Sequence, residues 1–219
     1  MGYEILVTLF LIVLMPLVLL GFIAFWTLVK RDRAFIEDTW RSYARSRHHE
    51  YLPARGEWPN RTSPSVRWRS GELRLQLFVV GVEADARTRL VAWPSGKLLG
   101  SFVVREKRSR RDGRRNGNVG IHDPAFACAF TVASKPANLA VRVLSDRARR
   151  ALLGFWQRDD VVLTYRRGKL TLDWPGRESN DARLDEAVRV MEDLVRGVED
   201  AFHHTTAPTV EVLGEQHAE

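Results

Sequence analysis

The sequence predicts an α+β protein in which an N-terminal single transmembrane helix precedes a mostly antiparallel sheet packed with helices, the last of them a long amphipathic helix. Three observations predict this class. Residues 5–29 contain no charged side chain, several segments between residues 66 and 175 alternate between apolar and polar positions, and residues 182–202 repeat apolar positions at helical spacing. At 219 residues, the chain has room for one domain and additional segments.

The first element is the uncharged segment 5–29, which leaves residues 1–4 as a short external N-terminus. A helix of about 20 apolar residues crosses the hydrocarbon core of a bilayer, so this segment is long enough to span it. A cleaved signal peptide is the alternative, but such a peptide begins with a positively charged region and has a shorter apolar core. The opening residues MGYE contain neither Lys nor Arg. We therefore expect a transmembrane helix that stays attached.

The charges that flank this segment predict its orientation. Lys30, Arg31 and Arg33 follow it directly, whereas no basic side chain precedes it. Positive charge collects on the cytoplasmic side of a membrane span. The sequence therefore predicts a single-pass protein of the cell inner (plasma) membrane, with its N-terminus outside and its C-terminal domain in the cytoplasm.

A juxtamembrane helix is predicted over residues 30–52, because Ile36, Trp40, Tyr43 and Arg47 recur at helical spacing. We expect this stripe to pack against the protein's own domain. The alternative is that it lies on the membrane interface.

A linker over residues 53–65, with three prolines and a glycine, leads to a cytoplasmic domain over residues 66–203. The first strand pattern of this domain is ELRLQLFVVGV, in which apolar and polar positions alternate. The segments TRLVAW and KLLGSFVVRE follow closely, with PSGK as a turn between them, so we expect an antiparallel meander. The segment VGIHDPAFACAFTV is predicted to form a loop and then a buried strand.

The second half of the domain carries two helix patterns and a hairpin. Ser145 is placed to cap a helix over DRARRALLGF, because its hydroxyl can accept a free backbone N–H. The segment VVLTYRRGKLTLDW predicts a hairpin that turns at RRGK. Residues 182–202 predict an amphipathic helix lying on the sheet, and residues 204–219 a disordered tail.

The densest charge lies in a basic loop over residues 105–118, REKRSRRDGRRNGN. Residues 105–115 hold seven basic and two acidic side chains, in a chain with a net charge of +7. Three interpretations stay open: a solvated loop, a contact with anionic lipid or an acidic partner, and a nucleic-acid contact. The last is the least expected, because the loop has no aromatic side chain on which a base could stack. The candidate contact residues are Arg105, Lys107, Arg108, Arg110, Arg111, Arg114 and Arg115.

The sequence predicts no catalytic, cofactor-binding or metal-binding residue. It contains no HExxH or CxxC spacing, no phosphate-binding glycine motif and no GxSxG. The single cysteine, Cys128, lies in the apolar run AFACAF and is expected to be a buried, unreactive thiol. His122 and Asp123 could form an acid–base pair, but the expected structure is a turn in which Asp123 caps local backbone and Phe126 enters the core.

Part of the domain resembles a pattern in bacterial membrane-anchored proteins of unknown function. In that pattern a DxxFxxxFxV strand precedes a capped leucine-rich helix and a GxLxL hairpin. The matching residues are Asp123, Phe126, Phe130, Val132, Leu144, Leu152, Leu153, Gly168, Leu170 and Leu172. The resemblance implies an intracellular membrane-anchored domain and no activity. Ala127 departs from it, because many relatives carry an acid at that position.

The expected function is that of a membrane-tethered interaction or scaffold module without catalysis. Its expected partners are the membrane lipid bilayer and either another protein or a second copy of the chain, in a homo-oligomer; no cofactor is expected. A domain that contacts or senses anionic lipid is the first alternative. An enzyme with an unrecognised site is a lower alternative, and nucleic-acid binding is the least expected.

Overall fold

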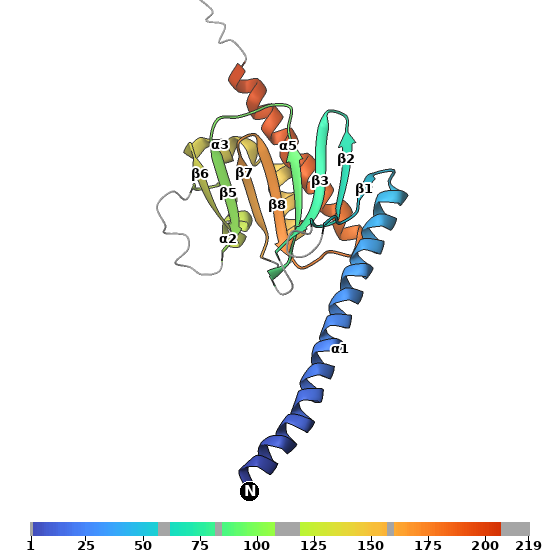
Figure 1. The fold of residues 1–219 in the computed structure, drawn as a ribbon. Coiled ribbons are helices and arrows are strands. Elements are labelled where there is room, and N and C mark those ends of the chain that lie inside the picture. Colours follow the sequence, from blue (N-terminus) through green and yellow to red (C-terminus); the bar gives the residue numbers. More distant parts are fainter. Residues whose placement is uncertain (1, 57–61, 82–84, 108–118, 157–159, 207–219) are drawn as a thin grey trace, which may run out of the picture.

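The computed structural model describes residues 2–56, 62–81, 85–107, 119–156 and 160–206. The elements, in chain order, are α1 (Gly2–Ser46), β1 (Glu50–Leu52), β2 (Ser65–Ser70), β3 (Leu73–Val80), β4 (Arg87–Trp93), β5 (Ser101–Glu106), α2 (Pro124–Ala129), β6 (Phe130–Lys135), α3 (Ala137–Val143), α4 (Asp146–Trp156), β7 (Val162–Arg166), β8 (Lys169–Pro175) and α5 (Asp181–Thr206). Figure 1 shows the strands side by side, helices behind them, and α1 projecting from one edge of the domain.

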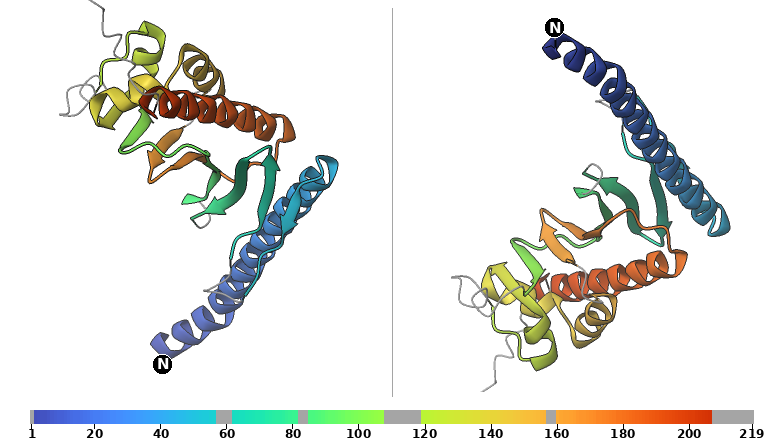
Figure 2. Two further views of the ribbon diagram at one scale, coloured as in Figure 1. Left: turned by 90° about the horizontal axis from the view of Figure 1, so that it is seen from above. Right: turned by 90° about the horizontal axis from the view of Figure 1, so that it is seen from below.

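The strands form one sheet of eight in the order β1-β2-β3-β4-β8-β7-β5-β6, and every named pair is antiparallel. Helices α3, α4 and α5 lie against one face of this sheet, and the other face carries none of these helices (Figure 2). The predicted α+β class with a mostly antiparallel sheet is therefore confirmed. The alternating residues Leu73, Leu75, Leu77 and Val79 of β3 are all buried, so the alternation predicted the inward face correctly.

The predicted meander is wrong in its third strand. β3 pairs with β4, but β4 then pairs with β8, and the β7–β8 hairpin separates β4 from β5. The connection between β4 and β5 passes over the end of this hairpin, where the Tyr165 hydroxyl accepts from the Leu98 N–H at 2.9 Å and donates to the Leu98 carbonyl at 3.1 Å. A hairpin that forms locally supplies two edges, and here both edges pair with strands more than 50 residues earlier in the chain.

The predicted β7–β8 hairpin has a two-residue turn. Arg167 and Gly168 take φ values of 55° and 72°, both in the left-handed region that a type I′ turn requires. Ser145 also has the predicted role, because its hydroxyl accepts from the Ala148 N–H at 3.3 Å at the start of α4. Asn180 caps α5 in the same way, accepting from the Ala182 N–H at 2.9 Å.

The segment before β6 forms a short helix, α2, and the prediction of a loop there is wrong. Asp123 caps this helix by accepting from the Phe126 N–H at 3.0 Å, and Phe126 enters the core as predicted. Helical spacing brings Phe126, Ala129 and Phe130 to the buried side. Cys128 consequently faces outward and is exposed, which overturns the prediction of a buried thiol.

The first helix is continuous from Gly2 to Ser46 and is shorter than predicted at its C-terminal end. His48 takes a φ of 56°, and the His49 N–H donates to the Ala44 carbonyl at 2.8 Å, which closes the helix before β1. Within the described part of the chain, no helix combines the length and the apolar character that crossing a bilayer requires. The predicted span 5–29 includes side chains outside the described ones.

The two predicted irregular segments are described in part: residues 57–61 of the linker and residues 207–219 of the tail lie outside the described residues. At the ends of the predicted linker 53–65, the Thr62 N–H donates to the Arg55 carbonyl at 2.8 Å, and β2 begins at Ser65. Helix α5 continues to Thr206, so the first residues of the predicted tail belong to that helix.

Candidate functional site

The end of α1 is built into the domain. Ile36, Trp40, Tyr43 and Ala44 are all buried, and Trp40 has no exposed surface. The Trp40 indole N–H donates to the Glu178 carbonyl at 2.7 Å, in the connection between β8 and α5. The expected packing of this stripe against the protein's own domain is therefore what the structure has, and the last turns of the helix are part of the core.

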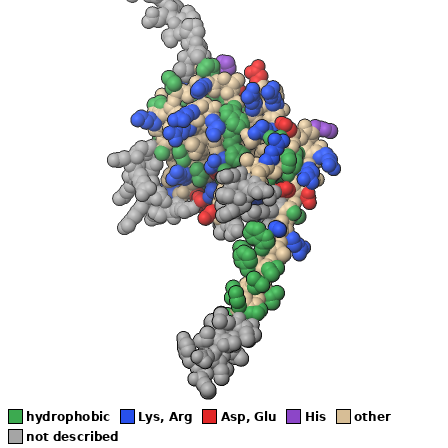
Figure 3. Space-filling model, viewed as in Figure 1, with side chains coloured by type: hydrophobic (Ala, Val, Ile, Leu, Met, Phe, Trp, Pro, Cys, Tyr) green, Lys and Arg blue, Asp and Glu red, His purple; other side chains and the backbone are tan. Residues whose placement is uncertain are grey.

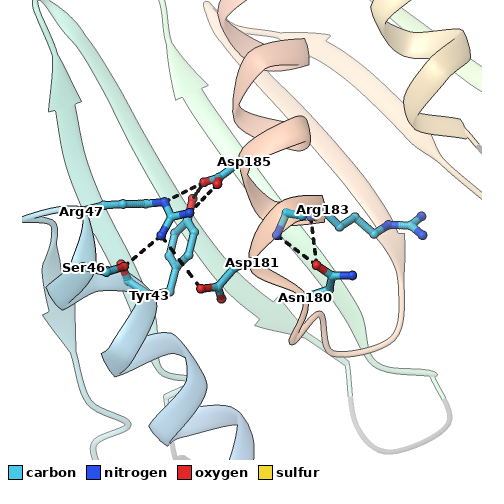
Figure 4. A network of polar contacts seen from close by, with 8 residues as sticks. Tyr43, Ser46, Arg47, Asn180, Asp181, Arg183 and Asp185 are labelled. Carbon is cyan, nitrogen blue, oxygen red and sulfur yellow. Dashed lines mark hydrogen bonds and ion pairs between the residues drawn. The ribbon is translucent and has the colours of Figure 1, made fainter.

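A polar network joins the end of α1 to the start of α5 (Figure 4). Asp185 accepts from the Tyr43 hydroxyl at 3.0 Å and from Arg47 Nε at 2.7 Å, and a second guanidinium nitrogen of Arg47 also binds its carboxylate. Arg47 lies 3.9 Å from an Asp181 oxygen, and its guanidinium stacks over the Tyr43 ring at 4.4 Å. Arg47 therefore joins the two helices through two hydrogen bonds to one carboxylate.

The charges in this network stabilise one another. Burial by itself raises the pKa of Asp185, but the hydrogen bonds from Arg47 and Tyr43 outweigh it and hold that pKa below its usual range. The pKa of Tyr43 is raised by burial and by the Asp185 charge. The pKa of His49 is lowered by burial and by the Arg47 charge, and its ring stacks on Trp68 at 4.7 Å. The ionised Asp185 and the neutral Tyr43 are thus the forms that hold α1 in place.

The open face of the sheet is strongly basic. In Figure 3, Lys and Arg side chains lie across the face of the domain that carries the strands, with apolar side chains between them. Two of these cations are paired: Arg89 Nε lies 2.6 Å from Asp173, and Arg87 lies 3.0 Å from Asp160. Others carry no ion pair with any described carboxylate; they are Arg67, Arg69, Arg74, Arg105, Arg166 and Lys169.

An open cavity of about 930 Å³ lies at the β2–β3 end of this face. Arg67, Arg69 and Arg74 line it from the strands, and Trp93 lines it from the end of β4. The residues that follow α1, from Arg47 to Glu50, form another wall. Trp68, Glu50 and Glu72 also line it. The arginines of the lining outnumber its two carboxylates, so the chemistry of the cavity suits an anionic group.

The structure places only some of the predicted contact residues. Arg105 is exposed on the open face of β5, and the Lys107 ammonium donates to the Ala127 carbonyl at 3.2 Å. The others in the basic loop, from Arg108 to Arg115, lie outside the described residues. Lys30 and Arg31 are exposed on α1, with the Lys30 nitrogen 5.8 Å from the centre of the Trp26 ring. The Arg33 side chain also lies outside the described ones.

His122 and Asp123 do not form an acid–base pair. One Asp123 oxygen caps α2, and the other lies 3.2 Å from Arg149, so both are engaged in holding local structure. In the described ranges, no group of three or more His, Cys, Asp or Glu side chains is arranged to hold a metal ion.

The basic sheet face is the feature that sequence reasoning missed. The pattern was present, because Arg67, Arg69 and Arg74 occupy the positions that alternate with buried residues in β2 and β3. Only the pairing of the strands shows that these cations share a face with Arg166 and Lys169, nearly 100 residues later.

Comparison with known proteins gives a likeness in fold. No family model matches the chain, and no curated protein matches it. Among solved structures, the crystal structure of the mycobacterial trehalose monomycolate transport factor A, TtfA, is similar, with a TM-score of 0.54 and 15% sequence identity. The likeness covers 74% of this chain and 93% of that one. At this identity, the comparison shows that the two chains share a fold.

Proposed function

We propose that this chain is a single-pass membrane-anchored protein whose cytoplasmic α+β domain acts as an interaction or scaffold module. One observation carries the proposal: the last turns of α1 belong to the core of the domain, through Trp40 and Tyr43. A helix joined to its domain in this way holds the domain at a fixed place and orientation. An anchor with that property suits a module that presents a surface to partners.

The middle of α1 supports the role of anchor. Exposed apolar side chains cover it between Leu14 and Trp26, with exposed fractions from 44% to 69%. Contiguous apolar surface of this kind marks a membrane or protein contact. Lys30 and Arg31 follow it, as the basic flank of a cytoplasmic membrane edge does.

The anchor predicts where the protein fractionates in cells. The full chain is expected in the membrane fraction and to resist extraction at alkaline pH. Replacing both Leu17 and Leu20 by Arg should release it, because each Arg near the centre of a span costs about 2.5–3.5 kcal/mol. The control variant, with both residues replaced by Ala, should stay in the membrane. A full chain found in the soluble fraction would overturn the proposal.

The exposed Cys128 provides a test of orientation. A membrane-impermeant maleimide should leave this thiol unlabelled in intact spheroplasts and label it after lysis, because the domain is proposed to lie in the cytoplasm. Labelling in intact spheroplasts would place the domain on the outer side. A thiol that reacts only after denaturation would contradict the exposed position of Cys128 on α2.

A contact with anionic lipid is the alternative function. It is favoured by Arg105 and Lys107, the described basic side chains of the segment 105–118, which lie at the end of β5. Each basic side chain near an anionic surface contributes about 1 kcal/mol. Equal recruitment of the protein to neutral and anionic vesicles would rule this function out.

The likeness in fold favours one more candidate. The similar structure is that of a transport factor for trehalose monomycolate. An interaction module held at a membrane suits a role in such transport here. Cells depleted of the protein would then show reduced transport of that molecule, and unchanged transport would remove this candidate.

A further inference from the structure

A line of cations crosses the open face from one side of the sheet to the other. We call it the basic row. In order from β2 to β6, its cations are Arg69, Arg74, Lys169, Arg166 and Lys135, with Trp93 between Arg74 and Lys169 and Ser101 between Arg166 and Lys135. Cross-strand partners set this order: Arg69 lies opposite Arg74, Arg74 opposite Trp93, and Arg166 opposite both Lys169 and Ser101. Ala92 lies opposite Leu170, so Trp93, which follows Ala92, and Lys169, which precedes Leu170, occupy the next position of the same antiparallel pair. Ser101 lies opposite Lys135.

The cations of the basic row are uncompensated. Arg69, Arg74, Lys169, Arg166 and Lys135 are all exposed, and none forms an ion pair with a described carboxylate. Like charges directly opposite on neighbouring strands destabilise a sheet, and the row contains two such pairs. By contrast, two of the three arginines nearer the other end of the strands are paired, Arg89 with Asp173 and Arg87 with Asp160, whereas Arg105 pairs with no described carboxylate. Most of the unpaired charge described on this face therefore lies in one line, where an anionic partner would relieve it.

The row lies far from the membrane edge that α1 defines. The cavity of about 930 Å³ contains Arg69, Arg74 and Trp93 from the row and also Arg47 and His48, so the row lies level with the C-terminal end of α1. From residue 29 to residue 46, a helix rises about 26 Å. At physiological salt the Debye length is about 8 Å, so headgroup charge at the membrane is screened at that distance. The surface of its own membrane is not the partner that this row fits.

We propose that the basic row binds an acidic, extended peptide segment of a partner protein, laid across the strands. The row spans six strand spacings, about 29 Å, which an extended chain of roughly nine residues covers. Arg69, Arg74 and Arg166 have the planar, forked donors that match a carboxylate. Single-stranded nucleic acid fits less well, because Trp93 is the one aromatic side chain of the row and base stacking needs several. The inference rests on the proposed interaction module and names the chemistry of its partner.

The test uses the full chain in nanodiscs of neutral phosphatidylcholine, with a fluorescein-labelled oligo-glutamate peptide of 12 residues as the probe. Saturable binding is expected at physiological ionic strength. Replacing Arg69, Arg74 and Arg166 by Gln should raise the Kd about tenfold or more, because three contacts with carboxylates are lost. These side chains point away from the core, and their replacement removes two pairs of like charges, so the variant should unfold at the same temperature as the original or at a higher one.

The matched control replaces Arg45, Arg150 and Arg196 by Gln. These arginines are exposed on α1, α4 and α5, and the variant has the same net charge as the first one. Its Kd should stay within about twofold of the original. Equal weakening by both variants, or no saturable binding to the peptide, would overturn the proposal.

Two further probes separate the alternatives. Tighter binding of a labelled oligothymidine than of the peptide would replace the acidic segment with nucleic acid as the partner. The second probe is an anionic vesicle added to the chain in its neutral nanodisc. If the original chain binds such vesicles and the Arg69/Arg74/Arg166 variant does not, the row would be reassigned to lipid. Incorporation of the chain into nanodiscs is measured separately from peptide binding. A chain that inserts but does not bind the peptide contradicts this inference and leaves the proposed anchor standing. A chain that fails to insert contradicts the proposed anchor, and peptide binding is then measured on the same chain in detergent.

Discussion

Replacing Trp40 by Ala is expected to lower the free energy of unfolding by about 3–5 kcal/mol. Trp40 has no exposed surface and donates its indole N–H to the Glu178 carbonyl at 2.7 Å. Its removal leaves a cavity between α1 and the domain and an unpaired carbonyl in the connection to α5. Denaturation of the full chain in detergent, followed by tryptophan fluorescence and circular dichroism, measures the loss.

Phe35 provides the control on the same helix. Its side chain is 60% exposed, so the change to Ala should alter the unfolding free energy by less than about 0.5 kcal/mol. If the Trp40 variant is as stable as the Phe35 variant, then α1 is not part of the folded core and does not hold the domain.

The second large effect is expected at Asp185. Changing it to Asn should lower the unfolding free energy by about 2–3 kcal/mol at neutral pH, because Arg47 loses the carboxylate that receives its hydrogen bonds. The side chains of Arg47 and Asp185 are 31% and 32% exposed, so the loss is smaller than for a fully buried pair. The control is Asp38→Asn, which breaks an exposed pair with Arg41 and should change stability by less than about 0.5 kcal/mol.

The Asp185 effect also predicts a dependence on pH. Because the pKa of Asp185 is lowered in the folded protein, its ionised form contributes stability above the unfolded pKa of about 3.9. That contribution is lost as the pH falls through the folded pKa. The stability difference between the original chain and the Asn variant should therefore be constant above about pH 5 and shrink below pH 4. A difference that grows on acidification would contradict this role for Asp185.

Features that depend on neighbours along the chain were predictable from the sequence. The alternation from Leu73 to Val79 predicted the buried side of β3, and the spacing of Ile36, Trp40 and Tyr43 predicted a stripe that packs on the domain. The turn at Arg167 and Gly168 was also found, because a two-residue connection between alternating segments has few other solutions.

Features that depend on distant pairing were not predictable in the same way. The insertion of the β7–β8 hairpin between β4 and β5 depends on contacts such as the one between Tyr165 and Leu98, 67 residues apart. The error at Cys128 has a local cause, since a short apolar run fits both a buried strand and one turn of helix. The basic row also depends on distant pairing, because Arg74 and Arg166 come onto one line only through the register of four strands, β3, β4, β8 and β7.

Whether α1 and the domain form one rigid body is tested most directly by a distance measured between two spin labels. One label is placed at Ala24→Cys, on the exposed apolar part of α1, and the other at the native Cys128, the single cysteine of the chain. In nanodiscs, double electron–electron resonance should give one narrow distance distribution, which Trp40→Ala broadens. A broad distribution in the chain with Trp40 intact would show that the helix swings freely and would contradict the fixed anchor.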